Sequence, residues 1–169
     1  MNRTYLTAAL AVLALPTVAY ADAEASKMLA PLDLSTPEAA VQSMMRAMYQ
    51  GDADMVDQVF HESAVLRRVT HDGELRPDGL KRWRDWVGTL AVGQAYEELF
   101  AIETEQRGRL ATVWAPFIIT YQGELTGCGV NTLTLVQTEQ DWQIIYGMDT
   151  GEPSGTCEGF KARYAKTDP

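Results

Sequence analysis

Few side chains in this sequence have the types and spacing that catalytic or metal chemistry requires. The only two histidines, His61 and His71, are isolated, and no His-Glu-x-x-His pattern or closely spaced cysteine pair is present to hold a metal. The sequence also contains no Gly-x-Ser-x-Gly nucleophile motif and no glycine-rich phosphate loop. We therefore expect no metal site and no cofactor, and His61 and Asp149 are left as the candidate catalytic acid/base groups.

The N-terminal residues predict the compartment in which these side chains work. One arginine precedes an apolar run at residues 5–15, which is too short to span a bilayer, and a proline ends the run. Two overlapping Ala-x-Ala sites follow within residues 19–23, which is the pattern of a cleavable secretory signal. We expect a signal peptide over residues 1–21, cleaved after Ala21 or Ala23, and a periplasmic or secreted protein.

Cys128 and Cys157 are the only two cysteines, and secretion would take them to an oxidising compartment. A disulfide between them is favoured there, and closing the loop should stabilise the fold by about 3 to 4 kcal/mol. The alternatives are two buried thiols or one nucleophilic cysteine, which needs an adjacent base that the sequence does not place. No cysteine comes directly after the cleavage region, so we expect neither a lipid anchor nor a membrane anchor.

Composition and length limit the partners and the domain count. The chain has 23 acidic and 14 basic residues, a net charge of −9, and no basic stripe with interleaved aromatic residues. This balance disfavours nucleic acid as a partner. The length allows one domain, for which we expect a flexible lead at 22–34, the folded part at 35–152 and a C-terminal tail at 153–169.

Two helices are expected in the first part of the folded domain. Thr36 can cap the first helix, Pro37 suits its first turn and Gly51 can end it, after which Asp52 can cap the second. The apolar residues of both helices recur at helical spacing, so their common face predicts core. For the methionines of the first helix, an adaptable pocket wall is the alternative.

A strand at 63–69 and an Asp-Gly turn should precede a third helix, which Asp78 opens. Trp83 and Trp86 lie about one turn apart on this helix. Such large side chains either line a cavity or pack directly on the sheet.

The remainder of the chain, from residue 96, has strand periodicity. Breaks near residues 108, 122 and 140 predict four long strands in an antiparallel meander. Between residues 110 and 121 both strand parities are largely apolar, whereas a sheet covered on one side only would alternate more clearly. We therefore expect a second subunit to bury the other face, and so a homodimer.

Five local sequences carry a family resemblance: Gly51-Asp52, Phe60-His61-Glu62-Ser63-Ala64, Asp72-Gly73, Cys128-Gly129-Val130-Asn131 and Trp142-Gln143-Ile144. With them the chain resembles the nuclear transport factor 2-like (NTF2-like, or SnoaL-like) superfamily, in its secreted bacterial branch labelled "putative lumazine-binding". The resemblance implies a cone-shaped α+β fold, in which three N-terminal helices pack on a curved, mostly antiparallel β-sheet. It also implies an apolar cavity between the helices and the sheet.

Strand parity selects candidates for the wall of that cavity. If Tyr146 faces inward with the apolar residues of its strand, the side chain of Asn131 also faces inward. Asn131 would then be the strongly polar residue on that face. Trp114, Asn131 and Tyr146 are therefore the central ligand-binding candidates, with Trp83 and Trp86 beside them. The alternative for Asn131 is a hydrogen bond to backbone at a bend.

The same resemblance gives little support to catalysis. Superfamily members with a ketosteroid-isomerase-type site use a carboxylate base after the first strand and a tyrosine, and the corresponding positions here hold the arginine pair at 67–68 and Met44. Asp149 has the opposite parity to the residues expected to face the cavity. His61 lies at a helix-to-strand junction, where local hydrogen bonding is common.

We therefore predict a periplasmic, homodimeric NTF2-like module that binds a small apolar or aromatic ligand without catalysis. One alternative is an isomerase, cyclase or dehydratase that uses Asp149 or His61 with Tyr146. The other is a dimeric interaction protein whose cavity is filled by its own side chains.

Overall fold

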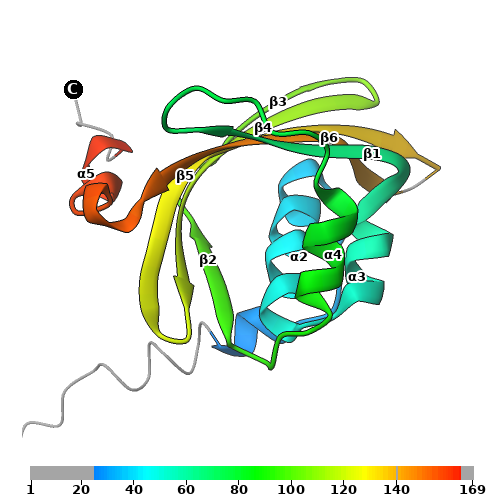
Figure 1. Cartoon of the computed structure of the whole chain (residues 1–169). Coiled ribbons are helices and arrows are strands. Elements are labelled where there is room, and N and C mark those ends of the chain that lie inside the picture. The colour runs from blue at the N-terminus through cyan, green and yellow to red at the C-terminus, as the bar shows by residue number, and fades with distance from the viewer. Residues whose placement is uncertain (1–24, 140, 165–169) are drawn as a thin grey trace, which may run out of the picture.

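Helices α2, α3 and α4 lie inside a strongly curved sheet in the computed structural model, which describes residues 25–139 and 141–164 (Figure 1). This arrangement confirms the predicted α+β fold, with helices against a curved, unclosed and mostly antiparallel sheet. The elements in chain order are α2 (Pro37–Gln50), α3 (Ala53–Val59), β1 (Phe60–Thr70), α4 (Leu80–Val87), β2 (Ala95–Leu99), β3 (Glu103–Arg107), β4 (Leu110–Tyr121), β5 (Glu124–Thr138), β6 (Asp141–Pro153), the 3-10 helix η1 (Ser154–Thr156) and α5 (Phe160–Tyr164).

The ends of the first two helices follow the predicted capping residues. Thr36 accepts a hydrogen bond from the Ala39 N–H at 3.1 Å, and Asp52 accepts from two N–H groups at the start of α3. Gly51 ends α2 with φ +68°, and a Cβ at this position would lie 2.2 Å from the Leu90 carbonyl oxygen. Only glycine fits this turn, because the backbone is left-handed and the neighbouring chain is too close for a side chain.

The sheet has the strand order β1-β6-β5-β4-β2, with β3 also paired to β4. β1 runs parallel to β6, and the other pairs are antiparallel. The prediction of four long strands after residue 96 is wrong in number, because the first of them is divided at Ala101, which has φ +46°. The bend lets β2 and β3 pair with opposite ends of β4.

The register of β5 and β6 decides which residues face the helices. Asn131 pairs with Asp149, whereas Thr134 pairs with Tyr146, and paired residues share a face of the sheet. Ile145 is an extra residue, a β-bulge, between two pairs of this register. The expectation that Tyr146 faces inward with Asn131 is therefore wrong, because the bulge reverses the parity of β6 and turns Asp149 inward instead.

The core lies between the helices and this inner face, defined here as the sheet face toward α2, α3 and α4. Residues 25–34 join the core from the N-terminal side, within the segment for which the sequence predicts a flexible lead. Met28 is buried, and the Gln50 side chain donates to its carbonyl oxygen at 3.0 Å. The largest fully buried side chains of the core include Met45, Met48, Leu133, Leu135, Ile144, Val41, Val56 and Val113.

The outer face of the sheet is covered at one end by the last described residues. Cys128 on β5 and Cys157 form the predicted disulfide, with 5.7 Å between their Cα atoms. Phe160 of α5 packs beside them against Phe100, and Lys161 pairs with Glu98 at 2.6 Å. The stretch predicted as a tail thus contributes η1 and α5, which lie against the sheet (Figure 1).

The predicted signal peptide, with its cleavage sites, lies outside the described residues. Within the described part of the chain, no helix combines the length and the apolar run that crossing a bilayer requires.

Candidate functional site

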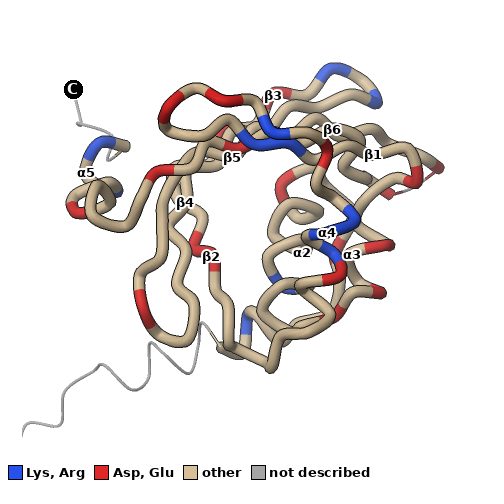
Figure 2. The backbone as a smooth tube through the Cα atoms, viewed as in Figure 1, with Lys and Arg blue, Asp and Glu red and all other residues tan. Residues whose placement is uncertain are grey.

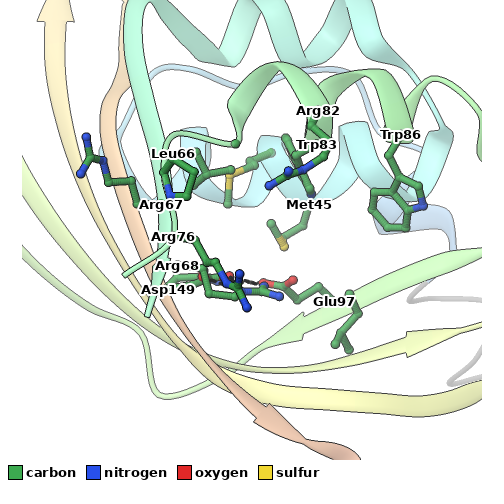
Figure 3. Close-up of a pocket in the computed structure, with 15 residues that line it drawn as sticks. Met45, Leu66, Arg67, Arg68, Arg76, Arg82, Trp83, Trp86, Glu97 and Asp149 are labelled. Atoms are coloured by element: carbon green, nitrogen blue, oxygen red, sulfur yellow. Dashed lines mark hydrogen bonds and ion pairs between the residues drawn. The ribbon is translucent and has the colours of Figure 1, made fainter. Parts of the chain in front are cut away.

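A cavity of about 780 Å³ opens between the inner face of the sheet and helices α2 and α4. Its volume falls within the range of small-molecule sites. Leu66 and Arg68 of β1 close one side, and the polar side chains of β2, β5 and β6 form the floor (Figure 3).

The apolar part of the wall comes mainly from two helices. Met44 and Met45 are buried residues of α2, and Trp83 and Trp86 project from α4. Phe60 holds the ring of Trp83 in an edge contact, with centroids 5.9 Å apart. Both tryptophans thus pack in the fold and also line the cavity. The sequence offered these two roles as alternatives, and the structure combines them. Leu66, Pro77 and Ile119 complete this apolar surface.

The floor of the cavity contains a hydrogen-bonded carboxyl group. Asn131 is only 6% exposed, and its Nδ2 donates to Glu97 Oε1 at 2.7 Å. Burial raises the pKa of Glu97 to about 7, and the nearby Asp149 carboxylate acts in the same direction. The Asn131 amide and Arg68 oppose this rise, because both favour the ionised carboxylate. Glu97 therefore exchanges its proton near neutral pH.

An ion pair lies beside this carboxyl group. Arg68 and Asp149 are paired residues of β1 and β6, and Arg68 Nε donates to both carboxylate oxygens, at 2.9 and 3.1 Å. A second donor, Arg68 Nη2, also contacts Asp149 Oδ2. These hydrogen bonds raise the pKa of Arg68. Asp149 thus serves as the counter-ion of a fixed guanidinium.

Two further arginines lie at the opening. Arg76 pairs with Glu74 at 3.1 Å, and both side chains are more than half exposed. Arg82 also lines the cavity, and within the described residues it has no hydrogen bond or ion pair. Figure 2 shows basic residues along β1 and on α4, the two elements that carry Arg68 and Arg82. Arg67 also lines the cavity, but its guanidinium is directed to the other side of β1 (Figure 3).

The structure brings together four of the side chains singled out from the sequence. Trp83, Trp86, Asn131 and Asp149 all line the cavity. For Asn131 the partner is the Glu97 side chain, rather than the backbone group that was the alternative.

The other three candidates lie elsewhere. Trp114 is on the outer face and 53% exposed, because its neighbours Val113 and Ala115 occupy the inner parity of β4. Tyr146 is turned to the outer face by the bulge. His61 Nδ1 accepts a hydrogen bond from the Ser63 N–H at 3.1 Å, beside a separate surface groove.

Three residues of the site did not emerge from the sequence: Glu97, Arg68 and Arg82. Glu97 lies in a short strand where polar and apolar residues do not alternate, so parity gave no signal. Arg68 was recognised only as a departure from a catalytic pattern. One signal was available in Gly147, where a Cβ would lie 2.7 Å from Leu66 and 3.0 Å from Leu133, since glycine within a strand often marks a bulge or a close approach.

The chemistry open to this arrangement is binding and proton exchange. Within residues 25–139 and 141–164, no cluster of three or more histidine, cysteine or acidic side chains is placed to hold a metal ion. The apolar wall suits a ring or an alkyl skeleton, and the Glu97–Asn131 pair suits a group that donates or accepts a hydrogen bond.

Comparison with solved structures identifies the fold. An NTF2-like protein of unknown function from Shewanella baltica OS155 is 13% identical, with TM-score 0.52, and the match covers 68% of this chain and 89% of that one. One from Silicibacter pomeroyi DSS-3 is 18% identical, with TM-score 0.51, and the match covers 68% and 92%. A protein of unknown function from Mycobacterium tuberculosis is 14% identical, with TM-score 0.56, and the match covers 80% and 75%.

Sequence comparison agrees with this fold. No curated protein matches the sequence. The sequence model of a family described as "Putative lumazine-binding" matches residues 33–116, which include α2, α3, α4 and the strand that carries Glu97. The chain therefore belongs to the nuclear transport factor 2-like superfamily, in the family with this description.

Proposed function

We propose that this protein is a small-molecule-binding module whose ligand occupies the cavity between α4 and the sheet. The observation that carries the proposal is the composition of the cavity wall. Seven apolar side chains surround the space, and a hydrogen-bonded carboxyl group and an ion pair lie together on its floor. Specific sites for small molecules usually combine a mostly apolar wall with a few fixed polar groups in this way.

The description of the family supports an aromatic ligand. Lumazine is a flat heterocycle, and the rings of Trp83 and Trp86 offer flat apolar surface to such a molecule. Glu97 and Asn131 could then pair with the polar edge of a heterocycle. An open volume of about 780 Å³ argues against the alternative of an interaction protein with a filled cavity.

The proposal includes a periplasmic location and a homodimer. The Cys128–Cys157 disulfide is compatible with an oxidising compartment, as the N-terminal sequence predicts. On the outer face of β4, Leu110 and Trp114 are 51% and 53% exposed, and burial of such side chains by a second copy would be favourable.

An enzyme remains the second candidate because of Glu97. A carboxyl group with a pKa near 7 can accept and return a proton at physiological pH, which isomerases and dehydratases require. If the protein is an enzyme, Glu97 would be its acid/base group. The two candidates from the sequence fit that role less well, since His61 lies outside the cavity and Asp149 is held by Arg68.

Fluorescence of the uncharged probe N-phenyl-1-naphthylamine tests the binding site. Ile119 is on the cavity wall, so Ile119→Trp should fill the space and weaken probe binding at least tenfold. Leu110→Trp makes a similar change at an exposed site of the same strand and should leave the affinity unchanged. Thermal unfolding of both variants checks that they fold. Equal affinity in wild type and Ile119→Trp would contradict the proposal.

Glu97→Gln separates the module from the enzyme. The substitution keeps the shape and the Asn131 hydrogen bond but removes the exchangeable proton. In a binding module, a ligand identified by native mass spectrometry of the protein purified from its own cells should still bind and remain chemically unchanged. Turnover of that ligand by wild type, and none by Glu97→Gln, would establish the enzyme.

A further inference from the structure

The charges around the cavity do not balance. Arg68 is matched by Asp149, and Arg76 shares its charge with Glu74, but Arg82 has no partner within the described residues. Glu97 adds less than a full negative charge near neutral pH, because burial raises its pKa to about 7. The wall therefore carries excess positive charge in a chain whose net charge is −9. In a protein with this excess of acidic residues, a cluster of arginines at one opening is not expected by chance.

The position of Arg82 directs this charge at a ligand. Its side chain extends from α4 beside Trp83, across the cavity from Glu97 (Figure 3). The guanidinium lies close to Gly79, where a Cβ would come within 3.3 Å of Nη2, so glycine leaves room for it. A planar guanidinium offers two parallel N–H donors, which match the paired oxygens of a carboxylate or sulfonate.

We propose that the ligand of this cavity is an aromatic monoanion, whose acidic group binds Arg82 while its ring lies against Trp83 and Trp86. This inference rests on the proposed binding function and specifies its ligand class. A hydrogen-bonding group at the far end of the ligand meets Glu97 and Asn131 on the floor. One negative charge is the best match, because Arg82 is the one arginine among the described residues that is directed into the cavity and lacks a counter-ion, and the Glu97 and Asp149 carboxyl groups would repel a second anionic group.

Two related fluorescent probes isolate the charge. 8-Anilino-1-naphthalenesulfonate has the ring system of N-phenyl-1-naphthylamine and adds one sulfonate. We expect Arg82→Gln to weaken binding of the anionic probe about tenfold and to change binding of the uncharged probe less than twofold. Arg109→Gln is the matched control, since it removes the same charge from an exposed arginine remote from the cavity, and it should change neither affinity.

The outcomes distinguish this inference from the function on which it rests. If Arg82→Gln leaves the affinity for the anionic probe unchanged, or weakens both probes equally, the inference fails while the cavity remains a binding site. If Ile119→Trp displaces neither probe, the proposed function itself fails. A tenfold loss confined to the anionic probe in Arg82→Gln, together with full blockage by Ile119→Trp, supports both.

Discussion

The inner and outer faces of the sheet are built from alternate residues of the same strands, yet they are closed by different means. On the inner face Asn131 and Asp149 are polar and border an open cavity. On the outer face Cys128 is next to Phe160, under α5, and is held by a covalent bond. An open cavity lowers the stability of the fold, because its lining residues lack packing partners. The disulfide and the aromatic cluster on the outer face can offset this loss. Function and stability are thus separated across one sheet.

The largest expected effect is on the outer face. Replacing both Cys128 and Cys157 with serine should lower the free energy of unfolding by about 3 to 4 kcal/mol, because the unfolded chain regains a loop with a sequence separation of 29 residues. Urea unfolding of the variant and of the oxidised wild type measures this difference. Affinity for N-phenyl-1-naphthylamine should stay within twofold, and a large loss would show that the two faces are not independent.

On the inner face, Glu97→Gln should change the pH dependence of stability. Burial raises the folded-state pKa of Glu97 from 4.5 to about 7, so its favourable contribution is present below pH 4.5 and is lost as the pH rises through 7. Glutamine does not titrate, and the variant should therefore be more stable than wild type at pH 8 by about 2 kcal/mol. Chemical unfolding at pH 5 and pH 8 measures this difference, and the same fall in both proteins would show that Glu97 ionises normally.

Glu97 should also tune the affinity of the cavity for anions. Deprotonation adds a negative charge near Asp149, Asn131 and Arg68 and across from Arg82, so wild type should bind 8-anilino-1-naphthalenesulfonate more weakly at pH 8 than at pH 6. A decrease of about three- to fivefold is expected for a partly screened charge. Glu97→Gln should bind equally at both values. A pH dependence that persists in this variant would assign the effect to another group.

A smaller effect is expected from the ion pair on the inner face. Asp149→Asn leaves Arg68 without its counter-ion and should cost about 1 kcal/mol, since Arg68 is half exposed. The freed guanidinium should also strengthen binding of the anionic probe. Asp57→Asn removes a comparable partner of Arg84 on the helical surface and should cost less than about 0.5 kcal/mol without changing probe affinity. Equal effects of the two substitutions would remove the distinction between cavity and surface pairs.

The smallest effect on stability should follow Trp114→Gln on the exposed part of the outer face. The side chain is 53% exposed, so the free energy of unfolding of the monomer should change by less than about 0.5 kcal/mol. If a second copy covers this face, sedimentation should instead show a shift from dimer to monomer. A wild-type monomer at all concentrations would contradict the proposed dimer.

Local signals predicted the parts of the fold that depend on neighbouring residues. Thr36 and Gly51 mark the ends of α2 because capping chemistry acts within one helical turn. The disulfide followed from two cysteines and an expected compartment. Trp83 and Trp86 lie beside the cavity, and helical spacing indicated that they share a face of α4.

The floor of the cavity depended on information that strand parity does not contain. Period-two alternation assigns faces only while each residue has one partner, and the extra residue at Ile145 breaks that condition. Tyr146 and Asp149 were therefore assigned to the wrong faces. Glu97 meets Asn131 across an intervening strand, and no local pattern predicts contacts between strands so far apart in sequence.

The bulge at Ile145 makes the chemistry of the cavity depend on the geometry of one strand. If the same residues formed a regular strand, with Ile145 paired instead of bulged, the inward and outward positions along the second half of β6 would be exchanged. Asp149 would leave the floor, Tyr146 would enter it, and Arg68 would lose its counter-ion although no residue had been substituted. The gain or loss of a single β-bulge is therefore a route by which one scaffold can acquire different ligands without changes to its core.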